Sequence, residues 1–352
     1  MYPRSIVHFL LLSQLILGLS YSSISTATPQ ELVFLTWSEY MDPEIVQAFE
    51  KKYNAKIKFV YFETDETRND LLVQTNGQGY DLIMSNGSSI HKYYKRGWIA
   101  PISQNHVPNL KYIDKKWMKL FNKADGYSIP FFWGTTGIAY RKDLIGKTID
   151  SWKDLFQPAQ AQQGKIAMIR DSNDTISLAL KMLNYSANSE SRKEIKEAEA
   201  LLQAQKPFVK KYAYISIGKE SALISGDIHM SVAYSGDALA LKDIDDNIEY
   251  ALPKEGGMIW IDSILVSSYS KNKQLAYQFL SFINEPNRAK QLAEYVYCAT
   301  PNKAAEKLLS NEFLNDPVIY PSAAALSNSE TYGELKPRTN RLRNQIFSDL
   351  IQ

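Results

Sequence analysis

A tryptophan and an aspartate two residues apart form the pair in this sequence best suited to binding chemistry. Side chains alternate along a strand, so Trp260 and Asp262 share one face while Ile261 turns to the core. The face of an indole attracts a cation, and a carboxylate beside it accepts hydrogen bonds from an alkylammonium group. The pair alone fits a core tryptophan beside a surface aspartate equally well, because large aromatic residues mostly serve cores.

More acids and aromatics follow the ends of other predicted strands. Basic residues are rare there, Arg170 being the exception, whereas phosphate sites are glycine-rich and basic. Each group also has an ordinary explanation, because acids at a helix start are usually caps and residues 37–40 fit a tightly packed turn. The strand-end residues are Trp37, Ser38, Glu39, Tyr40, Asn86, Ser88, Asp171, Asp174, Tyr234 and Asp237.

The elements that position these residues alternate between strands and helices. Asp42 and Pro43 predict a helix start, as N-cap and first helical residue. A second helix is predicted from Thr175, and residues 190–205 read as a solvated helix. The alternation indicates a mostly parallel sheet, or two, and ligands of open α/β sheets bind outside the carboxyl ends of the strands. Strands are predicted at residues 32–35, 56–62, 81–84, 165–169 and 229–233.

Catalytic and metal-binding signatures are missing. The sequence has no phosphate loop, dinucleotide fingerprint, zinc-peptidase motif or nucleophile elbow. We interpret His91, His106 and His229 as surface or packing residues, since metal sites need several convergent ligands. Cys298 has no basic neighbour, which favours a packed or pocket-lining thiol. The sequence therefore predicts no enzyme, metal or cofactor, although a hydrolase with dispersed carboxylate pairs stays a formal alternative.

Length and charge place further bounds on the function. The chain has 352 residues, which suggests two domains or one large α/β unit. Lys and Arg number 40 against 38 for Asp and Glu, so the formal charge is only +2 and lacks the basic stripe that nucleic acids require. A single cysteine excludes an intrachain disulfide framework and a cysteine-rich zinc site.

The first 27 residues have the pattern of an export signal. Arg4 precedes a short apolar run, and small residues close the segment before an expected mature start near Thr28. A membrane anchor is the alternative, but Ser13 and Gln14 interrupt an apolar run shorter than the ~20 residues that a span requires. We expect a soluble mature protein in the periplasm.

Five segments resemble one family over nearly the whole mature chain. The sequence is similar to the periplasmic spermidine/putrescine-binding proteins of bacterial ABC polyamine transporters, which have the type II periplasmic binding-protein fold. The block from Lys254 to Ser263 is fairly specific to polyamine binders, and the others are shared more widely across that fold. The matching segments are residues 35–40, 127–134, 151–155, 253–263 and 299–305.

The resemblance implies a set of ligand-binding positions. Tyr234 stands where the family often has tryptophan. Ser88 and Cys298 replace expected tyrosines, and Tyr332 replaces an expected glutamine, which implies a reshaped pocket. The implied site comprises Trp37, Ser38, Glu39 and Tyr40 in the first binding loop, with Asn86, Ser88, Asp171, Asp174, Tyr234, Trp260, Asp262, Cys298 and Tyr332.

The same resemblance implies the fold and the partners. We expect two α/β lobes joined by a hinge of crossing strands, with the ligand cleft between them. Residues 28–138 and 261–307 would form lobe 1, and residues 139–260 and 308–352 lobe 2. The implied function is a polyamine receptor that closes on its ligand and delivers it to an inner-membrane ABC permease. A sensor that signals to a membrane protein is the alternative, and an exported amine or peptide hydrolase a weaker one.

Overall fold

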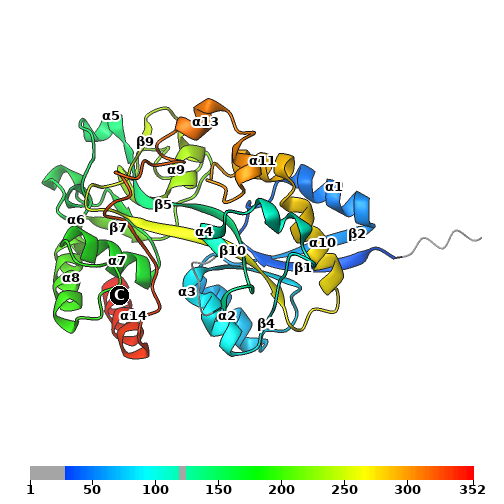
Figure 1. The fold of residues 1–352 in the computed structure, drawn as a ribbon. Coiled ribbons are helices and arrows are strands. Elements are labelled where there is room, and N and C mark those ends of the chain that lie inside the picture. The colour runs from blue at the N-terminus through cyan, green and yellow to red at the C-terminus, as the bar shows by residue number, and fades with distance from the viewer. Residues whose placement is uncertain (1–27, 119–123) are drawn as a thin grey trace, which may run out of the picture.

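Two α/β halves joined by two long strands make up the computed structural model, which describes residues 28–118 and 124–352 (Figure 1). The predicted export signal, residues 1–27, lies outside the described residues. Within the described ranges, we find no helix with both the length and the apolar character that a membrane crossing demands.

The strands form one mixed sheet with parallel ends and an antiparallel middle. Its order is β2-β1-β3-β10-β5-β8-β6-β7, with β4 and β11 added beside β10 and β9 beside β5. The strands are β1 (Gln30–Thr36), β2 (Ala55–Tyr61), β3 (Leu82–Asn86), β4 (Ile99–Ala100), β5 (Ile129–Arg141), β6 (Ile166–Met168), β7 (Val209–Tyr212), β8 (Met230–Tyr234), β9 (Ile248–Ala251), β10 (Met258–Ser267) and β11 (Glu330–Thr331).

The prediction of a mostly parallel sheet holds at the two ends of this order. Strand β1 pairs in parallel with β2 and β3, and β6 does so with β7 and β8. Strands β5 and β10 run antiparallel to each other and to their neighbours β8 and β3. Both strands cross from one half to the other, and together they pair with strands of each. Of the predicted alternatives, one sheet or two, the structure therefore has one sheet, which is parallel only at its two ends.

Local signals set most helix starts. The Asp42 side chain accepts the Glu44 N–H at 2.8 Å, which confirms the predicted cap. The helix predicted from Thr175 begins earlier, because Asp171 caps it. The helices are α1 (Pro43–Tyr53), α2 (Asp65–Gln74), α3 (Gly87–Lys95), α4 (Lys115–Met118), α5 (Lys142–Ile145), α6 (Lys153–Phe156), α7 (Ser172–Met182), α8 (Arg192–Gln205), α9 (Ser235–Lys242), α10 (Lys273–Ile283), α11 (Pro286–Tyr295), α12 (Lys303–Glu306), α13 (Asn311–Asn315) and α14 (Pro337–Ile351).

The solvated helix predicted over residues 190–205 is wrong in one respect. Helix α8 does form there, but Ile195, Ala198 and Leu202 on its inner face are buried. They pack in a cluster with residues of α7 and α14, because apolar residues three and four positions apart share one face of a helix.

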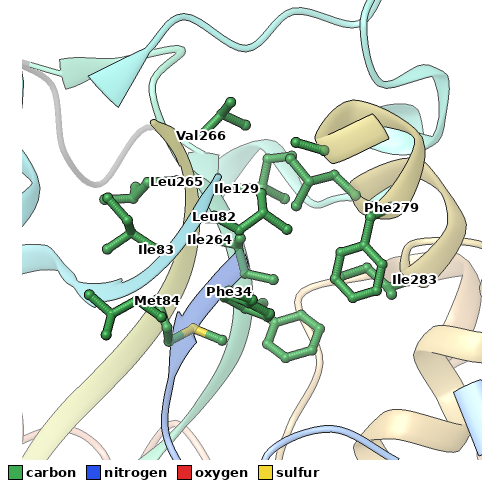
Figure 2. Packing of buried hydrophobic residues seen from close by; sticks show 14 of the residues in the cluster. Phe34, Leu82, Ile83, Met84, Ile129, Ile264, Leu265, Val266, Phe279 and Ile283 are labelled. Carbon is green, nitrogen blue, oxygen red and sulfur yellow. The ribbon is translucent and has the colours of Figure 1, made fainter. Parts of the chain in front are cut away.

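Each half has its own apolar core. In the first half, Phe34, Met84 and Ile264 from three neighbouring strands pack toward Phe279 and Ile283 of α10 (Figure 2). The core of the second half joins Ile138, Trp152, Ile176, Met230 and Leu350 from β5, the α6 region, α7, β8 and α14. The lobe boundaries that we predict at 138/139 and 260/261 fall inside β5 and β10 and stay a prediction.

Gly134 lets the two crossing strands approach at their centre. It pairs with Trp260 across β5 and β10, and a Cβ placed on it would lie 2.4 Å from Cζ2 of the indole and 2.7 Å from Oγ of Ser235. Both neighbours are buried and cannot move aside. Any larger residue at this position must therefore displace the indole or part the strands.

We predict that Gly134→Ala lowers the free energy of unfolding by about 3 kcal/mol, because overpacking of a closed core costs roughly 1–3 kcal/mol. Gly97→Ala is the control, since nothing lies within 4 Å of its added Cβ and only its left-handed φ of +68° is strained, at about 1 kcal/mol. Urea denaturation measures both variants, and equal losses would contradict the close approach.

Candidate ligand-binding site

Asp262 lies at the centre of the site, buried on the crossing strand β10. Its carboxylate accepts a hydrogen bond from the Tyr40 hydroxyl at 2.8 Å, and the Trp37 side chain also hydrogen bonds to it. The side chain is 7% exposed, so the surface aspartate that we weighed as an alternative is wrong. Burial raises the pKa of Asp262 to about 6, because water no longer solvates the charge.

The loop of residues 37–40 brings aromatic rings to Asp262. It leads from the end of β1 to the cap of α1, and Glu39 adopts a left-handed φ of 56° within it. Tyr40 packs edge-on against Phe132 of β5 with ring centroids 5.6 Å apart, and Trp37 packs against Phe62 at 4.3 Å. Ser38 and Glu39 are exposed. The loop is thus packed by its aromatics, while its polar residues stay open to solvent.

A second acidic group occupies the start of α7. Asp171 caps the helix by accepting the Asp174 N–H at 2.9 Å, as the ordinary interpretation of a helix-start acid expects. Asp174 is 3% exposed and accepts hydrogen bonds from Tyr234, at 3.0 Å, and from Tyr332. Burial raises the pKa of both carboxyl groups, and the charge of Asp174 raises that of Asp171 further.

Trp260 lies between the two acidic groups. It is two residues from Asp262 on β10 and packs edge-on against Tyr234, with centroids 6.0 Å apart and an angle of 75° between the rings. It is 8% exposed, and its indole N–H has no acceptor among the described residues. The indole therefore belongs to the core and to the wall between the acids at once.

Sequence reasoning missed two charged residues at this site, Arg68 and Asp65, which pair with each other. Arg68 of α2 is 0% exposed, and its guanidinium lies 2.6 Å from Asp65 and donates to Tyr93. Asp65 also accepts a hydrogen bond from Asn86, which pairs with Asp262 across β3 and β10. The sequence shows Asp65 only as an acid in a first helical turn, the usual place for a dipole partner.

One further acid, Asp237, lies in the first turn of α9. It is half-buried, and burial with the nearby charge of Glu39 raises its pKa to about 7. Cys298 is buried and forms no disulfide. Burial, and to a smaller extent the charges of Asp237 and Asp262, raise the pKa of its thiol well above the ordinary value. Its burial agrees with the expectation of a packed or pocket-lining thiol, and at neutral pH the thiol stays uncharged.

Carboxylates outnumber cations at this site. Among the described residues, Arg68 is the only base in an ion pair with any of the six acids Glu39, Asp65, Asp171, Asp174, Asp237 and Asp262.

The remaining predicted positions lie in different surroundings. Tyr332 joins Asp174, as above, whereas Ser88 falls in the first turn of α3 and its side chain is outside the described part of the structure. Nearby, Nδ1 of His91 on α3 lies 3.0 Å from the Glu334 carboxylate, which connects the first half to the segment before α14.

The other histidines have separate partners. His106 stacks on Tyr277 with centroids 4.5 Å apart, and His229 shares a hydrogen bond of 2.8 Å with Gln162. The three histidines therefore do not converge. In residues 28–118 and 124–352, no cluster of three or more His, Cys, Asp or Glu side chains is arranged to hold a metal ion.

The fold and the site together are those of a solute-binding protein. Two α/β halves are joined by the crossing strands β5 and β10, and acids with aromatic partners come from both halves. Residues 44–320 match the family model described as bacterial extracellular solute-binding protein. The chain belongs to this family, which is a solute-binding family and not an enzyme family.

Named relatives agree with the resemblance seen in the sequence. The spermidine/putrescine-binding periplasmic protein of Salmonella typhimurium is 32% identical over 325 residues, 92% of each chain. The norspermidine sensor of Vibrio cholerae is 29% identical and covers 92% of this chain and 89% of its own. The spermidine/putrescine ABC transporter substrate-binding protein of Streptococcus pneumoniae superposes with a TM-score of 0.78 at 25% identity, over 91% of this chain and 98% of that one. The predicted family resemblance and the two-lobed fold are confirmed.

The raised pKa of Asp262 predicts that the ligand-free protein loses stability as the pH rises. The folded state holds this proton more tightly than the unfolded chain, where the pKa is 3.8, so the stabilisation is complete below pH 3.8 and is lost as the pH passes about 6. Between pH 5 and pH 8 this carboxyl group accounts for a loss of about 1.4 kcal/mol.

Urea denaturation at pH 5 and pH 8 measures this loss, which Asp262→Asn should reduce. Asp143→Asn is the control. The Arg141 guanidinium lowers the pKa of this exposed carboxyl group, so its contribution to stability rises with pH instead of falling, and its removal should leave the loss in place. An unchanged loss in Asp262→Asn would show that this carboxyl group is not the cause.

Proposed function

We propose that this protein is a periplasmic polyamine receptor, which binds its ligand between two lobes, closes on it and delivers it to an inner-membrane ABC permease. The observation that carries the proposal is the set of buried, aromatic-walled carboxylates at Asp174 and Asp262, which have no ion pair with a base within the described residues. A multivalent organic cation supplies the missing charge. The named relatives support the same ligand class.

The chemistry of a polyamine fits both parts of the site. Its methylenes need apolar walls, and burying each contributes ~0.8 kcal/mol. Its ammonium groups need acceptors, and each charge-assisted hydrogen bond adds about 1.5–3 kcal/mol. Trp37, Tyr40, Trp260 and Tyr234 supply rings beside the carboxylates, and a well-placed ring adds about 0.5–2 kcal/mol. After an association cost of roughly 4–15 kcal/mol, micromolar or tighter binding remains.

Closure of the lobes follows from the same charges. In our proposal, residues 28–138 with 261–307 form lobe 1, and residues 139–260 with 308–352 form lobe 2. Asp262 and Asp65 belong to lobe 1 and Asp174 to lobe 2. The charge of Asp65 raises the pKa of Asp174 and also that of Asp262. An empty site therefore repels its own lobes, and a bound cation removes this repulsion. The crossing strands β5 and β10 would act as the hinge.

A sensor that signals to a membrane protein is the second candidate, and the norspermidine sensor among the relatives favours it. Both functions use one site and differ in the partner. Uptake of radiolabelled polyamine by cells with and without the gene separates them: lost uptake supports delivery to a permease, and unchanged uptake supports signalling. Ligand recovered unchanged after incubation with the protein would argue against the hydrolase.

We predict that calorimetric titration of the unfolded and refolded protein gives micromolar or tighter binding of at least one polyamine. Asp174→Asn should weaken it tenfold or more, because one charge-assisted acceptor is lost. The matched control is Asp70→Asn, which alters an exposed carboxylate on α2. Absence of heat with putrescine, spermidine, norspermidine and spermine would contradict the proposed function.

A further inference from the structure

We propose that the buried guanidinium of Arg68 positions two residues of the implied site, Asn86 and Trp37, without binding the ligand itself. The inference rests on the proposed function, because those two residues belong to the site of the receptor. It goes beyond that function by giving a role in ligand binding to an arginine on α2 that lies outside the implied site.

Arg68 is held in one orientation by the side chains around it. Its Nε donates to the Tyr93 hydroxyl at 3.0 Å, and its Nη2 donates to Oγ of Ser89 at 3.1 Å. Its Nη1 donates to Oδ1 of Asp65 at 2.6 Å. Tyr93 and Ser89 belong to α3, so the fully buried side chain joins α2 to α3. Because the guanidinium is planar, bonds in three directions leave it a single orientation.

Asp65 transmits this orientation to Asn86. One carboxylate oxygen of Asp65 accepts a hydrogen bond from Arg68, and the other accepts one from the side-chain amide of Asn86. Asn86 is the N-cap of α3, where an asparagine side chain usually accepts a backbone N–H, yet it makes no such cap bond. Its amide is bound to Asp65 instead, at the position of β3 that pairs with Asp262. The pair of Asp65 and Arg68 therefore fixes this amide on the strand next to the central carboxylate.

The same guanidinium supports an aromatic pair. Its carbon atom Cζ lies 5.3 Å from the centre of the Phe62 ring, within the range of a cation–π interaction. Phe62 packs against Trp37 with ring centroids 4.3 Å apart, and the Trp37 side chain hydrogen bonds to Asp262. Arg68 therefore stands behind two neighbours of Asp262, one on the paired strand and one in the loop after β1.

The charges of the ion pair act on Asp262 with opposite signs. Burial is the largest cause of the raised pKa of Asp262, and hydrogen bonds from the loop of residues 37–40 lower this pKa. From α2, the charge of Asp65 raises the pKa of Asp262, and the charge of Arg68 lowers it. The thiol of Cys298, which also faces Asp262, is uncharged at neutral pH. Removing either member of the pair should therefore change the protonation of Asp262, in opposite directions.

An ion pair that serves only the fold is the alternative. Replacing a buried ion pair by apolar residues is often neutral or stabilising, so stability alone gives little reason for this pair. A purely structural Arg68 would change the stability of the protein when substituted and leave the pH dependence of ligand binding as it is. A positioning residue changes that pH dependence.

The experiment is calorimetric titration of the refolded full chain with spermidine between pH 5 and pH 8. Arg68→Lys keeps the charge and loses the planar fork, so binding at pH 8 should weaken about tenfold or more. Binding weakens as Asp262 takes up its proton, and the pH midpoint of this loss should move up in Arg68→Met and down in Asp65→Asn. The same Lys and Met substitutions at Arg141, which pairs with Asp143 at the end of β5, are the matched controls. They should change the affinity less than twofold and leave the midpoint in place.

The outcomes separate the inference from the proposed function. A smaller loss of affinity in Arg68→Lys would overturn the inference and leave the proposed receptor standing. Midpoints that Arg68→Met and Asp65→Asn move in the same direction, or not at all, would also overturn it. Binding of no polyamine by the wild type would overturn the proposed function and the inference together. Asp65→Asn replaces only one oxygen of the side chain, so its downward shift tests the inference even if neither Arg68 variant folds.

Discussion

The excess of buried carboxylates over cations is the physical constraint that explains the rest of this site. Removing an acid from water disfavours its charged form, and neighbouring acids add to the penalty. The protein offsets part of it with hydroxyl donors, as Tyr40 does for Asp262 and Tyr234 for Asp174. Arg68 offsets another part by holding Asp65. The negative charge that remains uncompensated can be neutralised by a small-molecule cation.

The architecture brings these acids together from distant parts of the chain. Tyr40 and Asp262 are separated by 222 residues, and Asp174 and Tyr332 by 158. The crossing strands β5 and β10 make this possible, because each runs antiparallel through both halves and places its centre between them. The same strands connect the two cores, so a change of angle between the halves would alter the distances among the acids.

Local features of the fold could be predicted from the sequence, and long-range features of the site only in part. The Asp42 cap and the strand before it follow from neighbouring residues, and both are confirmed. The burial of Asp262 depends on pairing with β3 and β5, which the pair Trp260 and Asp262 does not reveal. Arg68 was missed because its partners Ser89 and Tyr93 lie on another helix. The resemblance placed Tyr332, but its bond to Asp174 required the folded chain.

The central claim is that a polyamine neutralises carboxylates whose pKa values the empty site raises, to about 6 for Asp262 and about 7 for Asp237. The most direct measurement is the number of protons released when spermidine binds at pH 6.5, obtained by titration calorimetry in two buffers of different ionisation enthalpy. Alkylammonium groups are almost fully charged at this pH, so released protons come from the protein. The account predicts a net release on binding, because the cation favours the charged carboxylates. Binding without proton release, or with proton uptake, would contradict it.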